Sequence, residues 1–187
     1  MKTVKPHQIR IIAGKHRGRK IPVADRAGLR PSPNRVRETL YNWLQFEIAG
    51  AYVLDAFAGS GALGLEALSR GAASVLFCEK NSENVSGLRD ILQTWKEIHT
   101  RVMQTDTLSL VPQTAYDLIL LDPPFDQNLH QQCIEKFTNS AWLKPHGKIY
   151  IESHQPLSAY VLAQGFDWIK QAKAGQVHYG LIGYAHD

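Results

Sequence analysis

The strongest chemical signal in the sequence is the motif Asp122-Pro123-Pro124-Phe125, which directly follows an apolar stretch at residues 116–121. The two prolines fix the backbone and remove two N–H donors, which leaves rigid carbonyl groups directed outward. The Asp122 side chain and the Pro123 carbonyl can then accept both hydrogens of one exocyclic amino group, while Phe125 offers a face on which a flipped base stacks. Such acceptors aim the nitrogen lone pair at an electrophile, as methylation of an aromatic amine requires. A simple Pro-Pro turn explains the prolines, but not the acid and the aromatic ring that flank them.

A second signal is the glycine turn Gly59-Ser60-Gly61, which follows an apolar run and precedes a helical pattern. Glycines let the backbone approach a ligand closely, and the N-terminus of the next helix presents unpaired N–H groups to it. Gly59, Gly61 and Gly64 spell GxGxxG, and Glu79 follows Gly59 by twenty residues, so a dinucleotide fingerprint is formally satisfied. GxGxxG alone is weak evidence, and a loop that binds no ligand has the same letters.

Asp55 argues against a dinucleotide, because it ends the strand at the place where a pyrophosphate would lie. A fixed carboxylate repels a dianion and attracts a ligand that carries an ammonium and a sulfonium group, such as S-adenosylmethionine. Glu79 at the second strand end is placed to accept both ribose hydroxyls, and Asp106 at the third could accept from the adenine amino group. The predicted cofactor residues are Asp55, Phe57, Gly59, Ser60, Gly61, Glu79, Asp106 and Arg37.

Positive charge is concentrated at the N-terminus of the chain. Residues 1–37 contain eleven of the 21 Lys and Arg residues and one of the 17 acids, so this segment carries +10 and the remainder −6. A basic segment on an acidic body predicts a polyanionic partner. A solvated, disordered tail is the alternative, since runs of charge often are tails.

The basic segment nevertheless has the composition of a folded hairpin rather than a tail. Apolar residues flank the turn-like stretch at 14–18, which predicts two short strands joined by a cationic loop. A loop of this kind could reach phosphates, which position a protein and confer salt-dependent affinity but select no base. The predicted RNA-binding residues are Arg10, Lys15, Arg17, Arg19, Lys20 and Arg30. We accordingly divide the chain into a basic hairpin extension, residues 1–34, and a catalytic domain, residues 35–187.

The catalytic domain alternates apolar strands with amphipathic helices, which is typical of an α/β fold with a mostly parallel sheet. An amphipathic helix comes first, and Arg37 and Glu38 near its start either contact cofactor or target or face solvent. The expected helices are 35–48, 62–70, 82–95, 129–141 and 157–163, and the expected strands are 52–57, 74–79, 101–104, 116–121, 147–152, 166–172 and 177–184. The last two strands lack an intervening helix and should pair antiparallel. This pattern predicts the Rossmann-like, seven-stranded sheet of class I S-adenosylmethionine-dependent methyltransferases.

The remaining composition narrows the class of protein. No apolar run approaches the ~20 residues that cross a bilayer, and the N-terminus lacks the apolar region of a secretory signal. Cys78 and Cys133 form no CxxC pair, and the eight histidines show no ligand spacing, so we expect reduced thiols and no metal site. These features indicate a cytoplasmic protein without a membrane partner, which we expect to be a monomer.

At this point the chain resembles the RsmD-type 16S ribosomal RNA guanine-N2 methyltransferases over essentially its whole length. The resemblance rests on Arg10-Ile-Ile-Ala-Gly14, Arg17-Gly18, Arg30-Pro-Ser-Pro-Asn-Arg-Val-Arg-Glu38, Asp55-Ala-Phe-Ala-Gly-Ser-Gly61 and Asp122-Pro-Pro-Phe125. It implies methyl transfer from S-adenosylmethionine to N2 of one guanine, position 966 in standard 16S numbering, in the assembled or nearly assembled 30S subunit. Ser32 stands where Thr is usual and Tyr41 where Phe is usual, and both keep polarity or shape.

The residues themselves leave the base open, because guanine N2, adenine N6 and cytosine N4 all offer an amino group to Asp122. The choice of guanine therefore rests on the resemblance. A DNA or tRNA amino-methyltransferase would use the same groups. An NAD-dependent oxidoreductase fits GxGxxG but leaves Asp55 and the Pro-Pro motif unexplained, and a non-catalytic RNA-binding assembly factor has no use for three intact acids.

Overall fold

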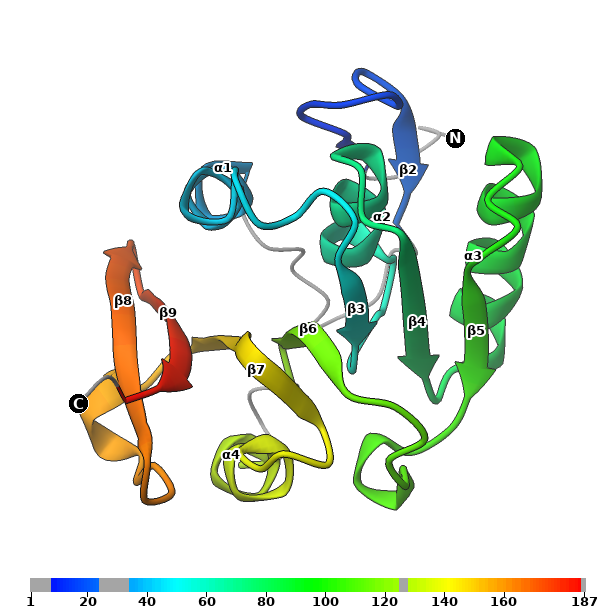
Figure 1. Ribbon diagram of the computed structural model, residues 1–187. Helices are drawn as coiled ribbons and strands as arrows, with labels where there is room; N and C mark the ends of the chain where they lie inside the picture. The colour runs from blue at the N-terminus through cyan, green and yellow to red at the C-terminus, as the bar shows by residue number, and fades with distance from the viewer. Residues whose placement is uncertain (1–7, 24–33, 125–127, 186–187) are drawn as a thin grey trace, which may run out of the picture.

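The computed structural model describes residues 8–23, 34–124 and 128–185. Its main sheet has seven strands in the order β5-β4-β3-β6-β7-β9-β8, and a separate two-stranded sheet pairs β1 with β2 (Figure 1). The strands are β1 Gln8–Arg10, β2 Lys20–Pro22, β3 Tyr52–Asp55, β4 Ser74–Glu79, β5 Arg101–Gln104, β6 Tyr116–Leu121, β7 Leu143–Ser153, β8 Phe166–Ala174 and β9 Val177–Tyr184. This is the predicted seven-stranded α/β architecture.

The order of the strands reverses between β3 and β6. From β3 the chain moves outward through β4 to β5, and then returns to place β6 on the other side of β3. β4, β3, β6 and β7 are joined by parallel pairings, whereas β9 pairs antiparallel with both β7 and β8, as the missing helix predicted. In open α/β sheets, ligands bind outside the carboxyl ends of the strands where the strand order reverses. The ends of β3 and β6 form that point here.

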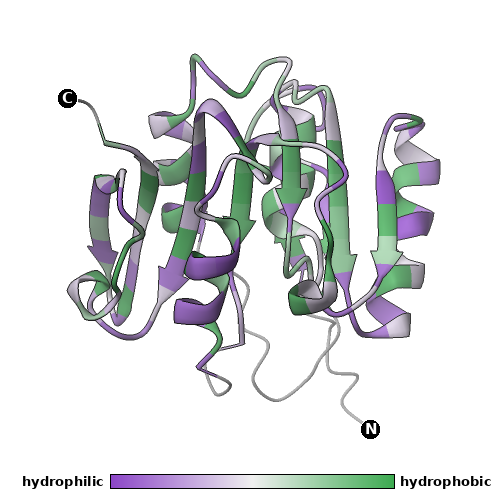
Figure 2. Ribbon diagram, turned by 60° about the horizontal axis from the view of Figure 1, so that its bottom comes forward, coloured by the Kyte–Doolittle hydropathy of each residue, from purple (hydrophilic) through white to green (hydrophobic). Residues whose placement is uncertain are grey.

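Helices cover both faces of the sheet, because the parallel strands alternate their apolar side chains between the two faces. Val53 packs with α1, α2 and α3 on one face, and the next residue, Leu54, packs with α4 on the other. The helices are α1 Asn34–Trp43, α2 Ala62–Ser69, α3 Ser82–Trp95 and α4 His130–Phe137, with short 3-10 turns η1 Thr107–Ser109 and η3 Leu157–Ala159. Apolar residues predominate in the central strands, while the helices carry many polar residues (Figure 2).

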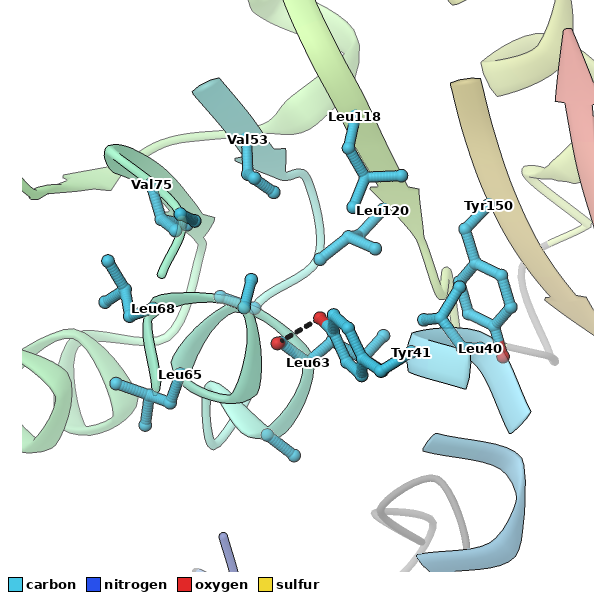
Figure 3. Close-up of a cluster of buried hydrophobic side chains, with 14 of the residues drawn as sticks. Leu40, Tyr41, Val53, Leu63, Leu65, Leu68, Val75, Leu118, Leu120 and Tyr150 are labelled. Carbon is cyan, nitrogen blue, oxygen red and sulfur yellow. Dashed lines mark hydrogen bonds between the residues drawn. The ribbon is translucent and has the colours of Figure 1, made fainter. Parts of the chain in front are cut away.

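The core on the α1 side is shown in Figure 3. Leu40 and Tyr41 from α1 and Leu63 from α2 lie against the strand residues of β3 and β6, and all three are buried. The Tyr41 hydroxyl donates a hydrogen bond to the Leu63 carbonyl at 2.6 Å, which joins the two helices without an unpaired polar atom at this point. The residue that departs from the usual Phe of the resembled family therefore fixes α1 to α2.

Several elements differ from their predicted bounds. The helix expected at 157–163 is only the 3-10 turn η3 Leu157–Ala159. α1 ends at Trp43, and the chain continues to Ile48 as turns that still bury Leu44 and Ile48. α4 is shorter than predicted, because Thr138 leaves the helical region with ψ 65°. β7 begins four residues early. Lys144-Pro145-His146-Gly147 has the composition of a turn but lies within the strand, beside an irregularity in its pairing with β6.

The N-terminal hairpin forms as predicted, with Ile9 of β1 opposite Ile21 of β2 in an antiparallel pair. Both isoleucines, together with Ile11 and Val23, belong to the same buried cluster as α1 and α2. The hairpin therefore shares the core of the catalytic domain, and the division at residue 34 describes charge rather than separate folding. No helix in the described part of the chain is long and apolar enough to span a bilayer.

Candidate active site

Acidic side chains mark the ends of adjacent parallel strands. Asp55 ends β3, Glu79 ends β4 and Asp122 follows β6, while Asp106 lies just beyond β5. Because β4, β3 and β6 are neighbours and run in the same direction, the structure brings these acids to one edge of the sheet. This edge is the one at which the strand order predicts ligand binding.

The glycine turn between β3 and α2 has a backbone that only glycine tolerates well. Gly59 has φ 52° and Gly61 has φ 80°, both in the left-handed region. A Cβ atom on Gly61 would lie 2.3 Å from Leu88 Cδ2, so the turn also packs directly against α3. The Ala58 N–H donates to the Cys78 carbonyl at 2.9 Å, which holds the turn over the end of β4.

Asp55 lies beneath this turn and is 2% exposed. Its Oδ2 accepts a hydrogen bond from the Gly64 N–H at 2.9 Å, and a Cβ atom on Gly64 would lie 2.8 Å from that oxygen. The third glycine of GxGxxG thus lets α2 begin close to the carboxylate. Burial raises the pKa of Asp55 to about 7, and the negative charge of Glu79 adds to the rise. Hydrogen bonds from backbone N–H groups oppose it.

Glu79 links the end of β4 to the glycine turn. Its Oε2 accepts from the Gly59 N–H at 2.8 Å, and its Oε1 accepts from the Asn81 N–H at 2.7 Å. Asp106 lies farther out, where it accepts from the Leu108 N–H at 2.9 Å and pairs with Lys80 at 2.6 Å. The bond from Lys80 and the bond from Leu108 lower the pKa of Asp106.

This set of groups fits S-adenosylmethionine better than a pyrophosphate. Two carboxylates, Asp55 and Glu79, already accept the N–H groups of Gly64 and Gly59 at the glycine turn, and a third, Asp106, lies beyond the next strand end. Buried negative charge disfavours a second anion, whereas a ligand with cationic and hydroxyl groups supplies what carboxylates accept. Among the described residues, no group of three or more His, Cys, Asp or Glu side chains could hold a metal ion.

The acceptor motif stands beside the donor groups. Asp122 is partly buried, Pro123 is buried and Pro124 is exposed, while Phe125 lies outside the described residues. Burial raises the pKa of Asp122 well above its usual range, and the nearby charges of Glu152 and Asp55 raise it further. Asp55 and Asp122 thus follow two paired, parallel strands, β3 and β6, at the same edge of the sheet.

Sequence reasoning missed Glu152, a buried carboxylate near the end of β7. Its Oε1 accepts a hydrogen bond from the Tyr150 hydroxyl at 2.9 Å. A signal was present, because an acid within the apolar run Ile149-Tyr150-Ile151 needs a partner when it is buried. The run was interpreted only as strand, since nothing local connects it with Asp122.

The structure excludes one of the two alternatives expected for Arg37. Its side chain is completely buried, so the alternative of a charge that faces solvent is wrong. Its guanidinium donates to the Arg10 carbonyl at 2.9 Å and to Asn34 Oδ1 at 2.7 Å, and it lies 3.6 Å from Glu66 Oε2. We therefore reassign Arg37 from cofactor contact to a structural role, in which it ties α1 to the strand before the cationic loop.

Glu66, which sequence reasoning also passed over, completes this connection. It is fully buried in α2, and its two oxygens accept from the backbone N–H groups of Ile12 and Ala13 at 2.8 and 3.1 Å. Arg70 donates to the same carboxylate at 2.8 Å. The hairpin is thus anchored to the helix that begins at the glycine turn.

The cationic loop also contacts the body of the protein, so part of its charge has an internal partner. Lys15 pairs with Glu97 at 2.6 Å, and the buried His16 ring stacks on Trp95 with 4.0 Å between ring centroids. Arg19 lies over the same Trp95 ring at 5.5 Å. The remaining predicted RNA contacts, Arg10, Arg17 and Lys20, are exposed, and Arg30 lies outside the described residues.

Comparisons with known proteins identify the family of this chain. The family model described as "Conserved hypothetical protein 95" matches residues 9–183. Ribosomal RNA small subunit methyltransferase D of Escherichia coli K12 is 42% identical over 93% of this chain and 89% of its own, and the Haemophilus influenzae protein of that name is 40% identical over 93% of each.

Solved structures give the same result for the fold. "Putative methyltransferase yhhF from Escherichia coli" has a TM-score of 0.85 at 39% identity and covers 97% of this chain and 100% of its own. "SMU.776, a putative methyltransferase complexed with SAH" shares the fold alone, with a TM-score of 0.71 at 15% identity over 96% of this chain and 57% of its own. The chain belongs to the RsmD-type family of ribosomal RNA small subunit methyltransferases.

Proposed function

We propose that this protein transfers a methyl group from S-adenosylmethionine to the N2 amino group of one guanine in 16S ribosomal RNA. By its resemblance to the RsmD-type enzymes, the guanine is position 966 in standard numbering and the substrate is the assembled or nearly assembled 30S subunit. The proposal rests on one observation, which is that two motifs follow neighbouring strands of the sheet. The glycine turn after β3 and the Asp122 motif after β6 end paired, parallel strands at one edge.

The donor half of the site is formed by the glycine turn and the acids around it. We propose that Asp55 faces the cationic end of S-adenosylmethionine, that Glu79 accepts from its ribose and that Asp106 accepts from its adenine. Phe57 and Ser60 complete this set by their place in the turn. When bound, the cofactor supplies an electrophilic methyl group on its sulfonium. The solved structure of SMU.776, which is complexed with SAH, shares the fold alone.

The acceptor half orients the target amine. The Asp122 carboxylate and the Pro123 carbonyl accept its two hydrogens, and Phe125 stacks on the base. Orientation of this kind can contribute roughly 7–11 kcal/mol to a favourable transfer. No covalent intermediate with the enzyme is needed, because the oriented nitrogen is itself the nucleophile.

The hairpin and its loop form the proposed RNA-binding face. Arg10, Arg17 and Lys20 are exposed and close together in the chain, so they are available to phosphates. Lys15 and Arg19 contribute less free charge, because Glu97 and the Trp95 ring already contact them. Affinity from such contacts falls with increasing salt and does not choose a base.

Mapping of the methylated nucleotide tests the function directly. The protein is incubated with labelled S-adenosylmethionine and with unmodified 30S particles, naked 16S RNA, tRNA or DNA in separate reactions, and the product is located by mass spectrometry. We expect one N2-methylguanine in the 30S reaction. Methyl incorporation into DNA or tRNA instead would favour another amino-methyltransferase, and cofactor binding with no incorporation anywhere would favour a non-catalytic assembly factor.

Replacement of the acceptor carboxylate tests the division of the site into halves. Asp122→Ala should abolish methylation while the affinity for S-adenosylhomocysteine, measured by calorimetry, stays near that of the unaltered protein. Asp90→Ala, on the exposed surface of α3, is the matched control and should change neither quantity. Weak cofactor binding with normal turnover in Asp122→Ala would disprove the proposed role.

A further inference from the structure

We propose that Glu152 is a positioning residue for the transfer, which acts through Asp122 and helps that carboxylate to take up the proton that the target amine loses. The inference rests on the proposed function and deepens it, because it assigns a second acid to the acceptor half of the site.

The pairing of β6 with β7 places the two acids side by side. The strands are parallel, and Leu120 lies opposite Tyr150 and Leu121 opposite Ile151. Asp122 and Glu152 are the next residues of the two chains. Two acids therefore lie at the same level on neighbouring strands, although thirty residues separate them in the sequence.

Glu152 is a buried carboxylate with defined hydrogen-bond partners, not a charge on the protein surface. It is 2% exposed, its Oε1 accepts from the Tyr150 hydroxyl at 2.9 Å, and its backbone carbonyl lies 2.9 Å from His130 Nε2 of α4. These contacts fix the carboxylate in place, so its effect on the reaction passes through the partly exposed Asp122.

The ionisable groups near Asp122 and Glu152 come from β3, β7, β9, α1 and α4, the last through the His130 ring at the Glu152 carbonyl. Asp55 on β3 and Glu152 on β7 are acids that raise the pKa of Asp122, after the larger effect of its burial. Tyr150 on β7 and Tyr179 on β9 lie beside Glu152, and burial with the charge of Glu152 raises the pKa of Tyr150 well above its usual range, so this phenol stays a donor. Burial lowers the pKa of Arg37 on α1, and the charges of Glu66, Tyr41 and Glu152 oppose this shift.

The proton balance of the step explains why a second acid is useful. When the amine nitrogen forms its new bond to carbon, the leaving thioether keeps the electron pair of the broken carbon–sulfur bond. The nitrogen then carries the positive charge and loses one proton, whose bonding pair stays on nitrogen. The proton goes to the Asp122 carboxylate, which becomes neutral. A like charge next to Asp122 strengthens its hold on that proton.

The same arrangement sets the direction of the pH dependence. Asp122 accepts the amine hydrogens only when ionised, so activity should rise as pH increases through the pKa of Asp122. Glu152→Gln removes one negative charge and lowers that pKa. The acidic limb of the profile should then move to lower pH, while the maximal rate at high pH should fall several-fold, because the carboxylate is a weaker base.

These changes are measured as the rate of single-turnover methylation between about pH 5 and about pH 9. Glu152→Asp keeps the negative charge, so its acidic limb should lie where that of the unaltered protein lies. Tyr150→Phe removes the hydrogen bond to Glu152 and makes Glu152 easier to protonate. Its acidic limb should therefore move to lower pH, but less than in Glu152→Gln. Glu135→Gln, on the exposed face of α4, is the control and should leave the profile unchanged.

A second readout does not depend on catalysis. Carbon-13 NMR of aspartate-labelled protein follows the titration of the Asp122 carboxyl group, which Asp122→Asn identifies by its absence. We expect this titration to move to lower pH in Glu152→Gln. Identical titrations in the two proteins would overturn the inference even if both methylate guanine. A shifted titration in a protein that methylates no RNA would instead retain the coupling and reject the proposed function.

Discussion

Two parts of the carboxyl edge of the sheet hold their acids in different ways. We call the ends of β3 and β4, where the methyl donor is proposed to bind, the donor edge, and the ends of β6 and β7, where the amine is proposed to bind, the acceptor edge. At the donor edge, Asp55 and Glu79 both accept hydrogen bonds from backbone N–H groups of the glycine turn and its helix. At the acceptor edge, Glu152 and Asp122 influence each other's charge, and the bond to Glu152 comes from a side chain, the Tyr150 hydroxyl. The hydrogen bonds at the donor edge fix the conformation of the glycine turn. The neighbouring charges at the acceptor edge change how tightly Asp122 holds a proton.

The difference follows from what lies next to each strand end. A glycine turn leads into the N-terminus of α2, where N–H groups are available to stabilise carboxylates. The acceptor motif contains two prolines, which offer no N–H donors, so a carboxylate there keeps its affinity for protons. We expect substitutions at the donor edge to change stability and cofactor affinity, and substitutions at the acceptor edge to change turnover and its pH dependence.

Asp55 provides the largest test of this comparison. Its pKa is raised from 3.8 to about 7 in the folded protein, so the folded state holds this proton more tightly than the unfolded chain does. The free energy of unfolding should therefore fall as pH rises from about 4 to about 7, by roughly 4 kcal/mol for this residue alone. Asp55→Asn should flatten the decline in urea denaturation measured at several pH values.

The exposed Asp90→Asn is the control for that experiment and should retain the decline. If Asp55→Asn and the unaltered protein lose stability equally between the two pH values, Asp55 is ionised throughout. The backbone N–H groups would then satisfy it completely, and the two edges would differ more sharply than we infer.

Glu79 gives the next largest effect. Glu79→Ala removes the acceptor for the Gly59 and Asn81 N–H groups and leaves the glycine turn without its link to β4. We expect the affinity for S-adenosylhomocysteine to fall roughly a hundredfold, from the loss of bonds to a charged group. Calorimetry with Asp122→Ala in parallel separates the edges, since that protein should bind normally. Equal losses in both proteins would show that the two edges are one energetic unit.

Gly64 gives the smallest expected effect. A methyl group there would lie 2.4 Å from the Phe77 ring and 2.8 Å from Asp55 Oδ2, so Gly64→Ala should lower the free energy of unfolding by about 1–3 kcal/mol. Gly87→Ala is a matched control within α3, because its added atom meets nothing within 4 Å and alanine favours the helix. Urea denaturation at one pH compares the two. A stable Gly64→Ala would mean that α2 can move away from Asp55.

Local patterns predicted much of the fold and the strand ends at which the candidate site residues lie. The strand ends at Asp55, Glu79 and Asp122 follow from apolar runs that stop at an acid, and the antiparallel β8–β9 pair follows from the absence of a helix between two strands. The bounds of α4 and β7 were predicted less well. Their ends depend on how Thr138 and the segment around His146 pack, and composition does not report packing.

The charged residues were the least predictable. Arg37 and Lys15 have the sequence context of surface charges, yet one is completely buried and the other is paired with Glu97. Both partners lie in other elements, Glu66 on α2 and Glu97 after α3. Phe125 and Arg30 lie outside the described residues, so their roles remain predictions.

The sequence by itself determined which acids reach the carboxyl edge of the sheet, because a strand and the turn that ends it are encoded by neighbouring residues. Only the tertiary structure decided which of those acids become neighbours. Asp122 meets Glu152 through the register between β6 and β7, and the hairpin meets α2 through the buried carboxylate of Glu66. Register and burial depend on contacts between distant segments, and these set the proton affinity on which the proposed chemistry relies.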